Sequence, residues 1–204
     1  MITIVDYGLG NIRAFINVYR RLDIPVQVAT NASDVKAAAK LILPGVGAFD
    51  HALELLDRSG MRESLDEVAA VGRVPVLGVC VGMQILAASS EEGSRRGLGW
   101  VEGEVKKFDV ATLGATMRLP HMGWNDVTPV VPSALFQGLE SGSRFYFLHS
   151  YYFRCAQREN VLAQTDYGAL FSCAIRAGNV YGVQFHPEKS HHFGARLLRN
   201  FAEL

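Results

Sequence analysis

Short, strongly apolar runs alternate with amphipathic segments through the first half of the chain. The clearest run spans Val74 to Val79, and similar runs lie at Ile2 to Val5, Val26 to Ala29 and Lys40 to Leu43. Strands that are apolar on both faces and separated by helices are typical of a parallel sheet covered on both sides. The pattern therefore predicts a layered α/β fold with a central, mostly parallel sheet flanked by helices.

Helical patterns fill the spaces between these runs. They lie at Asn11 to Leu22, with Asn11 as the cap, in a short segment capped by Ser33, and at Ala48 to Asp57, Met61 to Val71, Gly82 to Ala88 and Phe193 to Leu204. Each has apolar residues at helical spacing or a side chain that caps helices. The run from Pro44 to Gly47 is predicted to end the third strand as a sharp turn.

The second half of the chain changes character. Strand patterns lie at Trp100 to Phe108, Phe145 to Phe153, Phe171 to Arg176 and Val180 to His186, and the polar stretch Ser89 to Gly97 reads as a loop. Gly178-Asn179 favours a tight hairpin between the last two strands. Antiparallel strands are therefore expected to extend the parallel sheet or to form a second one.

Length, charge and cysteine content narrow the class of protein. The 204 residues suit a single domain over 1–204, and 20 basic residues balance 20 acidic ones. Nucleic-acid and anionic-membrane binders usually carry a basic excess, so neither partner is expected. Three scattered cysteines and no apparent signal peptide or membrane-length apolar run predict a cytoplasmic protein.

The turn after the run at Val74 to Val79 has the spacing of a nucleophile. Gly78-Val79-Cys80-Val81-Gly82 is the cysteine counterpart of the G-x-S-x-G elbow. The glycines let backbone and substrate approach closely, and the N-terminus of the next helix favours the reactive thiolate. Cys80 is thus the candidate nucleophile, although a lone cysteine after an apolar strand is more often a core residue.

A second motif lies near the end of the chain. His186 is expected at the carboxyl end of the last strand, where sheet enzymes place catalytic groups. Pro187 stops the strand, and Glu188 can return to hold the imidazole tautomer and stabilise the imidazolium. Taken alone, His186 is better explained as a hydrogen-bonded, partly buried histidine and Glu188 as a solvated turn residue.

A third element fits the same chemistry. Attack on a carbonyl creates an oxyanion that needs preorganised donors. The turn containing Val46 and Gly47 offers backbone N–H groups, and the Val81 N–H comes directly after the nucleophile. Cysteine, histidine and glutamate with such donors define acyl transfer through a thioester. The residues by themselves leave peptidase, amidase and glutaminase open.

These motifs resemble the two signatures of the triad-type glutamine amidotransferases. Further segments are similar to the glutaminase subunits of imidazole glycerol phosphate synthases: Asp6 to Asn11, Leu43 to Gly47, Pro120 to Asn125, Phe145 to Tyr151 and His186 to Ser190. The resemblance covers essentially the whole chain. It implies hydrolysis of L-glutamine without a cofactor. It also implies delivery of ammonia to a (β/α)₈-barrel synthase (cyclase) subunit, in a heterodimer that makes imidazole glycerol phosphate and AICAR in histidine biosynthesis.

The resemblance also assigns roles by motif position. Gln84 and Glu92 would hold the ends of the glutamine, with backbone contacts from Ser150 and Tyr151, while Val46 and Gly47 would form an oxyanion turn that rearranges when the synthase is loaded; Asn11, Trp124, Tyr146 and Lys189 would lie at or near the partner interface. Each has a structural alternative, such as core packing for Trp124, a solvated charge for Lys189 and a helix cap for Glu92.

Two other functions stay open at this point. Similar glutaminases serve a paralogous barrel subunit in building amidino groups on surface-polysaccharide sugars, and Phe147 to Phe153 and Ser190 to Phe193 are somewhat similar to that branch. A cysteine peptidase of similar layered fold is more distant, and Gln84 argues against it. Adjacent His191 and His192 point apart with no third ligand evident, so no metal site is expected. A barrel needs about 250 residues, so the synthase is expected on another chain.

Overall fold

The computed structural model describes residues 1–109, 118–139 and 142–204, in which strands and helices alternate before strands dominate. The strands are β1 (Ile2–Val5), β2 (Val26–Ala29), β3 (Leu41–Gly45), β4 (Val76–Cys80), β5 (Ser89–Ser90), β6 (Gly103–Lys107), β7 (His121–Pro129), β8 (Ser143–His149), β9 (Tyr151–Cys155), β10 (Val161–Asp166), β11 (Leu170–Ala177) and β12 (Val180–Val183). The helices are α1 (Ile12–Arg21), α2 (Ala32–Lys36), α3 (Phe49–Arg58), α4 (Arg62–Val71), α5 (Val81–Gln84) and α6 (His191–Glu203), with 3₁₀ turns η1 (Ala134–Phe136), η2 (Arg158–Asn160) and η3 (Pro187–Lys189).

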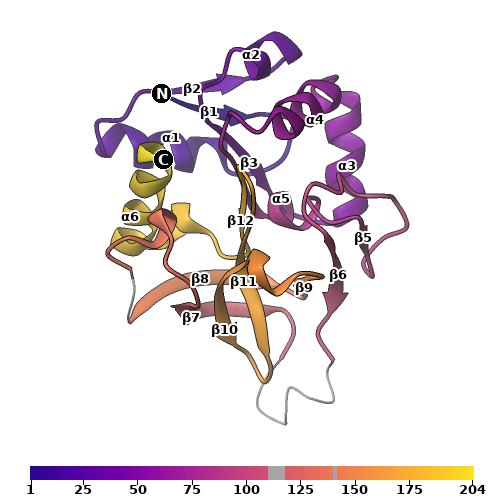
Figure 1. Ribbon diagram of the computed structural model, residues 1–204, viewed down its shortest axis with the longest axis vertical. Coiled ribbons are helices and arrows are strands. Elements are labelled where there is room, and N and C mark those ends of the chain that lie inside the picture. Colours follow the sequence, from indigo (N-terminus) through magenta and orange to yellow (C-terminus); the bar gives the residue numbers. More distant parts are fainter. Residues whose placement is uncertain (110–117, 140–141) are drawn as a thin grey trace.

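The described strands join into one sheet. Its main path runs β2-β1-β3-β4-β12-β11-β10-β7-β8, and β5, β6 and β9 join at the side. From β2 to β12 neighbouring strands are parallel. Helices α1 and α6 cover one face of this half, and α3, α4 and α5 cover the other (Figure 1). The layered α/β fold expected from the alternating runs is confirmed.

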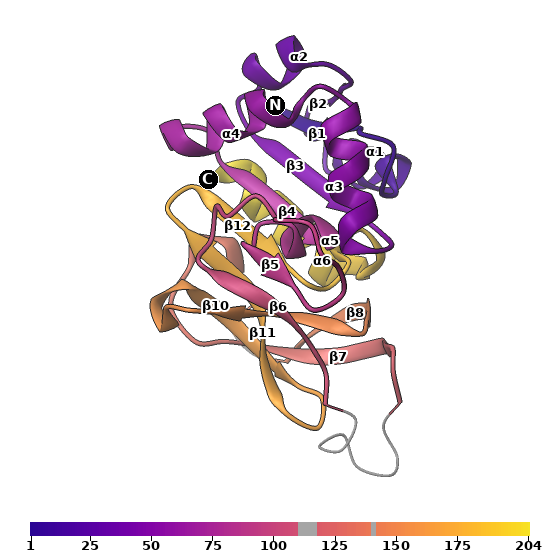
Figure 2. The same cartoon turned by 90° about the vertical axis from the view of Figure 1, so that its right-hand side faces the viewer.

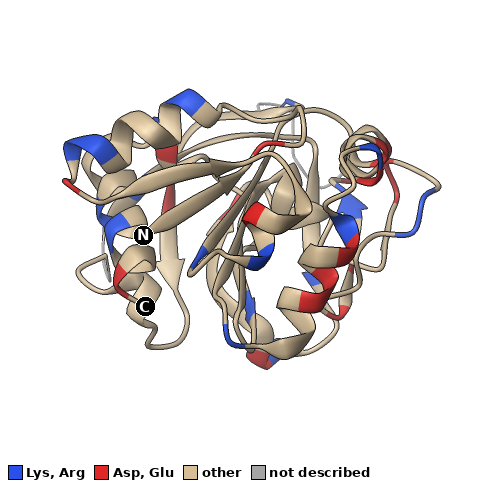
Figure 3. Cartoon of the chain, turned by 90° about the horizontal axis from the view of Figure 1, so that it is seen from above, with Lys and Arg blue, Asp and Glu red and all other residues tan. Residues whose placement is uncertain are grey.

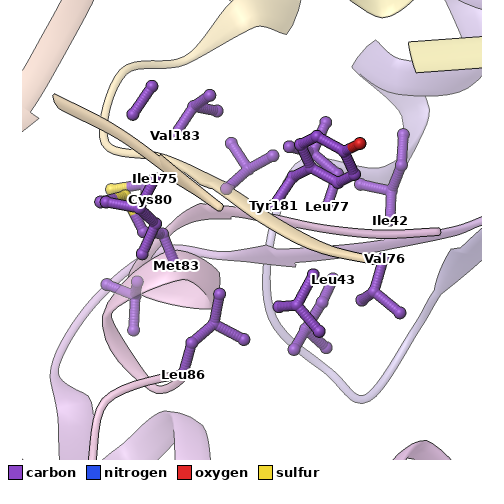
Figure 4. Packing of buried hydrophobic residues seen from close by; sticks show 14 of the residues in the cluster. Ile42, Leu43, Val76, Leu77, Cys80, Met83, Leu86, Ile175, Tyr181 and Val183 are labelled. Carbon is purple, nitrogen blue, oxygen red and sulfur yellow. The ribbon is translucent and has the colours of Figure 1, made fainter. Parts of the chain in front are cut away.

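The core lies where β3, β4 and β12 run side by side. Ile42 and Leu77 project to one side of these strands, and Leu43 and Val76 project to the other (Figure 4). All four side chains are fully buried. Burial on both faces is the reason that these strands are apolar runs rather than alternating patterns. It stabilises the fold because each fully buried side chain of this size contributes roughly 1.5–3 kcal/mol.

The antiparallel strands extend the parallel sheet, the first of the two arrangements expected. Strand β11 pairs with β12 across the hairpin at Gly178-Asn179, and β10, β7 and β8 follow (Figure 2). Lys and Arg residues and Asp and Glu residues are both spread over the molecule (Figure 3), in line with the net charge of +0. Among the described residues, no helix combines the length and apolar character needed to cross a bilayer.

Several local expectations were wrong. Helix α2 is capped by Asn31, whose Oδ1 accepts from the Asp34 N–H at 3.1 Å, and not by Ser33. Strand β3 does not stop at Leu43 but continues through Pro44. The Pro44 carbonyl accepts from the Tyr7 hydroxyl at 2.7 Å, on the side away from β4. The missing N–H of a proline on that side interrupts no bond to β4.

The second half also departs from the expectation. The predicted strand Phe145 to Phe153 is two strands that break at Ser150, because β8 pairs with β7 whereas β9 pairs with β6 and β11. Strands β7 and β10 were missed. Strand β7 carries Gly, Asn and Asp, which have low strand propensity, and its pairing with β8 overrides that preference. Part of the polar stretch read as a loop forms β5, which pairs with β6.

Candidate active site

Cys80 sits in a strained turn at the end of β4. Its backbone angles are φ 56° and ψ −114°, a conformation that glycine adopts easily and other residues do not. Such strain costs about 1–3 kcal/mol and persists only where the surrounding structure enforces it. The side chain is only 3% exposed. The elbow expected from the sequence is therefore present, although α5 is one turn long and not the helix Gly82 to Ala88, so its dipole is weaker than expected.

Two glycines make this turn possible. A Cβ atom on Gly82 would collide with the carbonyl oxygen of Leu43 in β3, and one on Gly78 would lie 2.5 Å from the Gly82 carbonyl oxygen. Helix α5 can therefore pack closely on β3 and β4 only without side chains at these positions. The parallel register of β3 and β4 pairs Gly45 with Cys80 at their carboxyl ends, which places the turn containing Val46 and Gly47 beside Cys80.

His186 is held three residues beyond the end of β12, rather than at its last residue as expected. Its backbone N–H donates to the Tyr146 carbonyl at 2.9 Å, so the chain leaves β12 and turns toward β8. Pro187 then begins η3, whose next residue returns toward the imidazole. The Glu188 Oε1 atom lies 2.9 Å from His186 Nδ1, and the two side chains are 2% and 3% exposed.

The electrostatics of the imidazole depend on Cys80 and Glu188. Burial alone lowers the pKa of His186, but hydrogen bonds to Cys80 and Glu188 and their negative charges outweigh burial and raise that pKa well above its ordinary value. A protonated imidazole beside a cysteine favours the nucleophilic thiolate form. Among the described residues, the second carboxylate oxygen of Glu188 is buried without a hydrogen-bond partner.

The sulfur has two further polar neighbours that the sequence reasoning did not single out. The Leu148 carbonyl oxygen at the end of β8 lies 3.9 Å from Sγ, and Gln184 Nε2 lies 3.8 Å from it. Gln184 is fully buried in an otherwise apolar segment next to His186. A buried amide in such a run was the available signal, since buried polar groups need specific partners.

A cavity of about 280 Å³ opens at Cys80. Cys80 and His186 lie in its wall, together with three residues to which the sequence gave no role in the site, Pro120, Leu148 and His149. The wall also contains every residue proposed for the oxyanion and the substrate: Val46, Gly47, Val81, Gln84, Glu92, Ser150 and Tyr151. Glu188 stands behind His186 and away from this wall. A larger hollow of about 600 Å³, between Pro129 and Gln137, has no titratable side chain in its lining and suits no comparable chemistry.

The proposed substrate residues are themselves held by hydrogen bonds. The Gln84 amide nitrogen donates to the Tyr151 carbonyl at 3.0 Å and to Gln184 Oε1 at 3.1 Å. Glu92 Oε2 accepts from the Phe49 N–H at 2.9 Å, at the first turn of α3. The helix-cap alternative for Glu92 is thus observed, and the carboxylate also faces the cavity. Partial burial raises its pKa, which the bond from Phe49 opposes.

The turn at Val46 and Gly47 has room to change conformation. Val46 is 40% exposed. Gly47 has φ of 106°, and a Cβ atom placed on it would meet nothing within 4 Å. Open space and a glycine in the left-handed region are what a reorienting peptide needs.

Three of the four residues expected at a partner interface lie together at the surface. Trp124 is 40% exposed, so core packing does not explain it. Its ring stands 6.2 Å from that of Tyr146, and Lys189 Nζ lies 5.8 Å from the same Tyr146 ring. Asn11 instead caps α1 by accepting from the Ala14 N–H at 3.2 Å.

The adjacent histidines do not converge on a common point. The His191 ring stacks on Trp124 at 5.1 Å, and the His192 ring lies 4.0 Å from that of Phe193. Within the described part of the chain, no group of three or more His, Cys, Asp or Glu residues is placed to hold a metal ion.

Fold and site together define a class of protein. A sequence profile described as glutamine amidotransferase class-I matches residues 3–204, and the chain belongs to that family. Among solved structures, a glutamine amidotransferase covers 99% of this chain with 97% of its own at a TM-score of 0.77 and 22% identity. A putative GMP synthase protein from Thermoplasma acidophilum reaches a TM-score of 0.72 at 21% identity, with 99% and 92% covered. These two likenesses are likenesses of fold.

The curated relatives identify the branch of that family. Imidazole glycerol phosphate synthase subunit HisH of Bdellovibrio bacteriovorus is 59% identical, with 100% of both chains covered. The protein of the same name from Leptospira interrogans, and HisH 2 from Pseudomonas aeruginosa, are 50% and 43% identical over 100% of both chains. Within the class-I glutamine amidotransferases, the chain belongs to the HisH family.

Proposed function

We propose that this chain is the glutaminase subunit of an imidazole glycerol phosphate synthase and acts in histidine biosynthesis. One observation carries the proposal: Cys80 and His186 line a single cavity, with Glu188 bonded to His186 from behind it, in a chain that is 59% identical to a HisH subunit over its full length. The relatives described above are all named as HisH subunits of imidazole glycerol phosphate synthase. They give no support to the amidino-sugar alternative or to a peptidase.

The proposed reaction begins at the sulfur. Cys80 attacks the side-chain amide carbon of L-glutamine, and the carbonyl oxygen becomes an oxyanion that backbone N–H groups of Val81 and of the Val46–Gly47 turn stabilise. His186 gives its proton to the leaving nitrogen, so that ammonia departs and a thioester remains. His186 then takes a proton from water, the hydroxide attacks the thioester, and glutamate leaves with Cys80 restored. Glu188 keeps the imidazole oriented throughout.

The cavity fits one small amino acid. Its volume of about 280 Å³ is at the small end of ligand sites. In the proposal, Gln84 and Glu92 hold the α-amino and α-carboxylate ends of glutamine, with the cation of the amino group toward Glu92. The backbone of Ser150 and Tyr151 supplies further contacts. Both side chains and both backbone segments line the same wall as Cys80.

The ammonia is proposed to pass to a (β/α)₈-barrel synthase subunit in a cytoplasmic heterodimer, with no nucleic acid and no cofactor involved. Trp124 and Tyr146 supply neighbouring aromatic side chains at the surface, of the kind that interfaces favour, and Lys189 lies beside them. Lys189 directly follows Glu188 in η3, so a partner that contacts Lys189 would contact the residue next to the triad. Asn11 is placed at the same interface by the family resemblance alone. Loading of the partner is proposed to turn the Val46–Gly47 peptide into its donor position.

The test is glutamate formation from glutamine, measured with and without the cognate barrel subunit carrying its nucleotide ligand. We expect little turnover by the isolated chain and a large increase in the loaded complex. Cys80→Ala should abolish turnover while partner binding, measured by calorimetry, is retained. Cys155→Ala is the matched control, because this thiol is outside the cavity and burial raises its pKa to about 11. Turnover by Cys80→Ala equal to that of the unaltered chain would refute the assignment.

A further inference from the structure

Two buried histidines lie beside the proposed site without a part in the reaction. His149 ends β8 and lines the cavity, and His121 begins β7 directly opposite it in the strand register. His121 Nδ1 lies 3.0 Å from His149 Nε2. The two side chains are 3% and 6% exposed. Buried polar pairs are costly unless they are fully hydrogen-bonded, so their bonding pattern is informative.

The bonds of this pair have one direction. His149 Nδ1 lies 2.8 Å from the Tyr151 carbonyl oxygen, which can only accept, so Nδ1 carries the proton. The neutral His149 ring then accepts at Nε2 from the Nδ1–H of His121. His121 Nε2 in turn accepts from Asn125 Nδ2 at 3.3 Å. Burial lowers the pKa of both histidines, which keeps both rings neutral and the direction unchanged.

The chain of bonds ends at the cavity wall. The Tyr151 carbonyl that accepts from His149 also accepts from Gln84 Nε2 at 3.0 Å. One residue earlier, the Ser150 carbonyl accepts from the Phe108 N–H at 3.3 Å. Ser150 is the break between β8 and β9, so the sheet ladder does not run continuously through this point. The side chains of His149 and Gln84 both donate to the Tyr151 carbonyl, and they thereby hold the backbone next to the break between β8 and β9.

We propose that His149, oriented by His121, is a positioning residue that fixes the Tyr151 carbonyl and thereby the Ser150–Tyr151 backbone that receives the glutamine. The inference rests on the proposed glutaminase function. His149 does not touch the reacting atoms in this role. It keeps the substrate wall in one conformation, and binding to a preorganised wall avoids the cost of ordering it.

Packing alone makes a different prediction. The His149 ring is surrounded by aromatic rings, at 5.3 Å from that of Phe171, 5.4 Å from that of Phe108 and 5.6 Å from that of Phe147. Phenylalanine at position 149 would fill this aromatic cluster without a buried polar group. If His149 only fills space, His149→Phe should therefore be tolerated. If His149 holds the Tyr151 carbonyl, any substitution that removes the Nδ1–H donor should weaken glutamine binding, and one that keeps a donor there should not.

The experiment compares His149→Asn with His149→Gln in the complex with the loaded barrel subunit. The asparagine amide can place its nitrogen near the position of Nδ1 and keep the donor to Tyr151, whereas glutamine places it near Nε2 and loses that donor. We expect the KM for glutamine to rise about tenfold in His149→Gln and His149→Phe, the effect of one lost hydrogen bond, with a smaller fall in kcat. His149→Asn should recover most of the loss. Tyr167→Phe is the control, because it removes a bond to the Arg118 carbonyl and keeps the ring on His121.

A second measurement reads the backbone without turnover. Amide hydrogen exchange at residues 150–152 should be faster in His149→Gln than in the unaltered chain and close to normal in His149→Asn. Equal KM and equal exchange in the Asn and Gln variants would overturn the positioning role, as would an unchanged KM in a folded His149→Phe. A complex in which the unaltered chain hydrolyses no glutamine would instead refute the proposed function, and exchange would still decide the inference.

Discussion

Replacing Glu188 by glutamine tests how much the orientation and protonation of the His186 imidazole depend on the charge of the carboxylate rather than on its shape. The Oε1 atom lies 2.9 Å from Nδ1, and neither side chain is more than 3% exposed. Glutamine is nearly isosteric and can still accept a hydrogen bond at Oε1. It removes the negative charge and introduces an NH₂ group that must be accommodated.

The magnitude follows from two effects. A hydrogen bond to a charged group contributes about 1.5–3 kcal/mol and a neutral one about 0.5–1.5 kcal/mol, so loss of charge alone lowers kcat roughly tenfold. Glu188 Oε2 is buried with no partner among the described residues, so an NH₂ group there would lack an acceptor at a cost of about 1–3 kcal/mol. That cost favours the flipped amide, which donates to Nδ1 and enforces the wrong tautomer. In serine-protease triads a wrong tautomer costs about 10⁴ in kcat.

We therefore expect kcat of Glu188→Gln to fall by between about tenfold and about 10⁴-fold, nearer the larger value if the amide flips, with residual turnover above that of Cys80→Ala. The negative charge of Glu188 helps to raise the pKa of His186. Its removal lowers that pKa, so the imidazolium is lost at lower pH and the alkaline fall in kcat/KM should begin at lower pH.

The assay is glutamate formation by the loaded complex, coupled to glutamate dehydrogenase and followed across a pH series. Glu203→Gln is the matched control, because this carboxylate is 63% exposed and forms a long surface ion pair with Arg199 at 3.9 Å. A Glu188→Gln variant whose kcat and alkaline limb coincide with those of the control would contradict the role given to the carboxylate.

Two further predictions concern stability. Gly82→Ala should lower the free energy of unfolding by about 3 kcal/mol and Tm by several degrees, because its Cβ collides with the rigid Leu43 carbonyl. Gly99→Ala should cost less in the same thermal melt, because space is open there and only the positive φ of 69° opposes a side chain. Burial lowers the pKa of His121 to about 4 and that of His149 to about 3, against about 6.5 in the unfolded chain. Below pH 6.5 the unfolded chain thus binds protons that the folded protein does not, so urea melts should show stability falling toward pH 4.5 by about 2–3 kcal/mol for each of the two histidines. The raised pKa of His186 adds no slope in that window, and His121→Asn should reduce the fall; equal slopes in both proteins would refute this account.

Much of the fold could be predicted from local pattern. The runs at β1, β2, β3 and β4 are apolar on both faces, and periodicity over a few residues reveals this. Strand β7 could not be predicted in this way, because its Gly, Asn and Asp residues disfavour a strand and only β8 makes it one. The same holds for the break at Ser150, which follows from β8 and β9 having different partners.

The candidate site divides along the same line. The elbow at Cys80 and the pair His186 and Glu188 are short-range motifs, in which turn chemistry brings neighbours in sequence together. Gln184 and His149 were given no role in the site, and His149 was expected to be structural, because a polar residue in an apolar run has no evident role until its partner across the fold is known. For Glu92 the sequence left two roles open, a substrate contact or a helix cap. Its bond to the Phe49 N–H joins residues that are far apart in the sequence, so local pattern could not decide between them.

The sequence by itself thus determined the layered α/β class, the strained turn at Cys80 and the imidazole–carboxylate pair, because periodicity, glycine conformation and turn chemistry act over a few residues. Tertiary structure alone decided that the Cys80 sulfur meets His186, that His149 and His121 are joined by a one-way hydrogen bond, and that the histidine pKa values move in opposite directions. Sheet register and removal of water bring distant residues together, and neither is written in any local stretch of the chain.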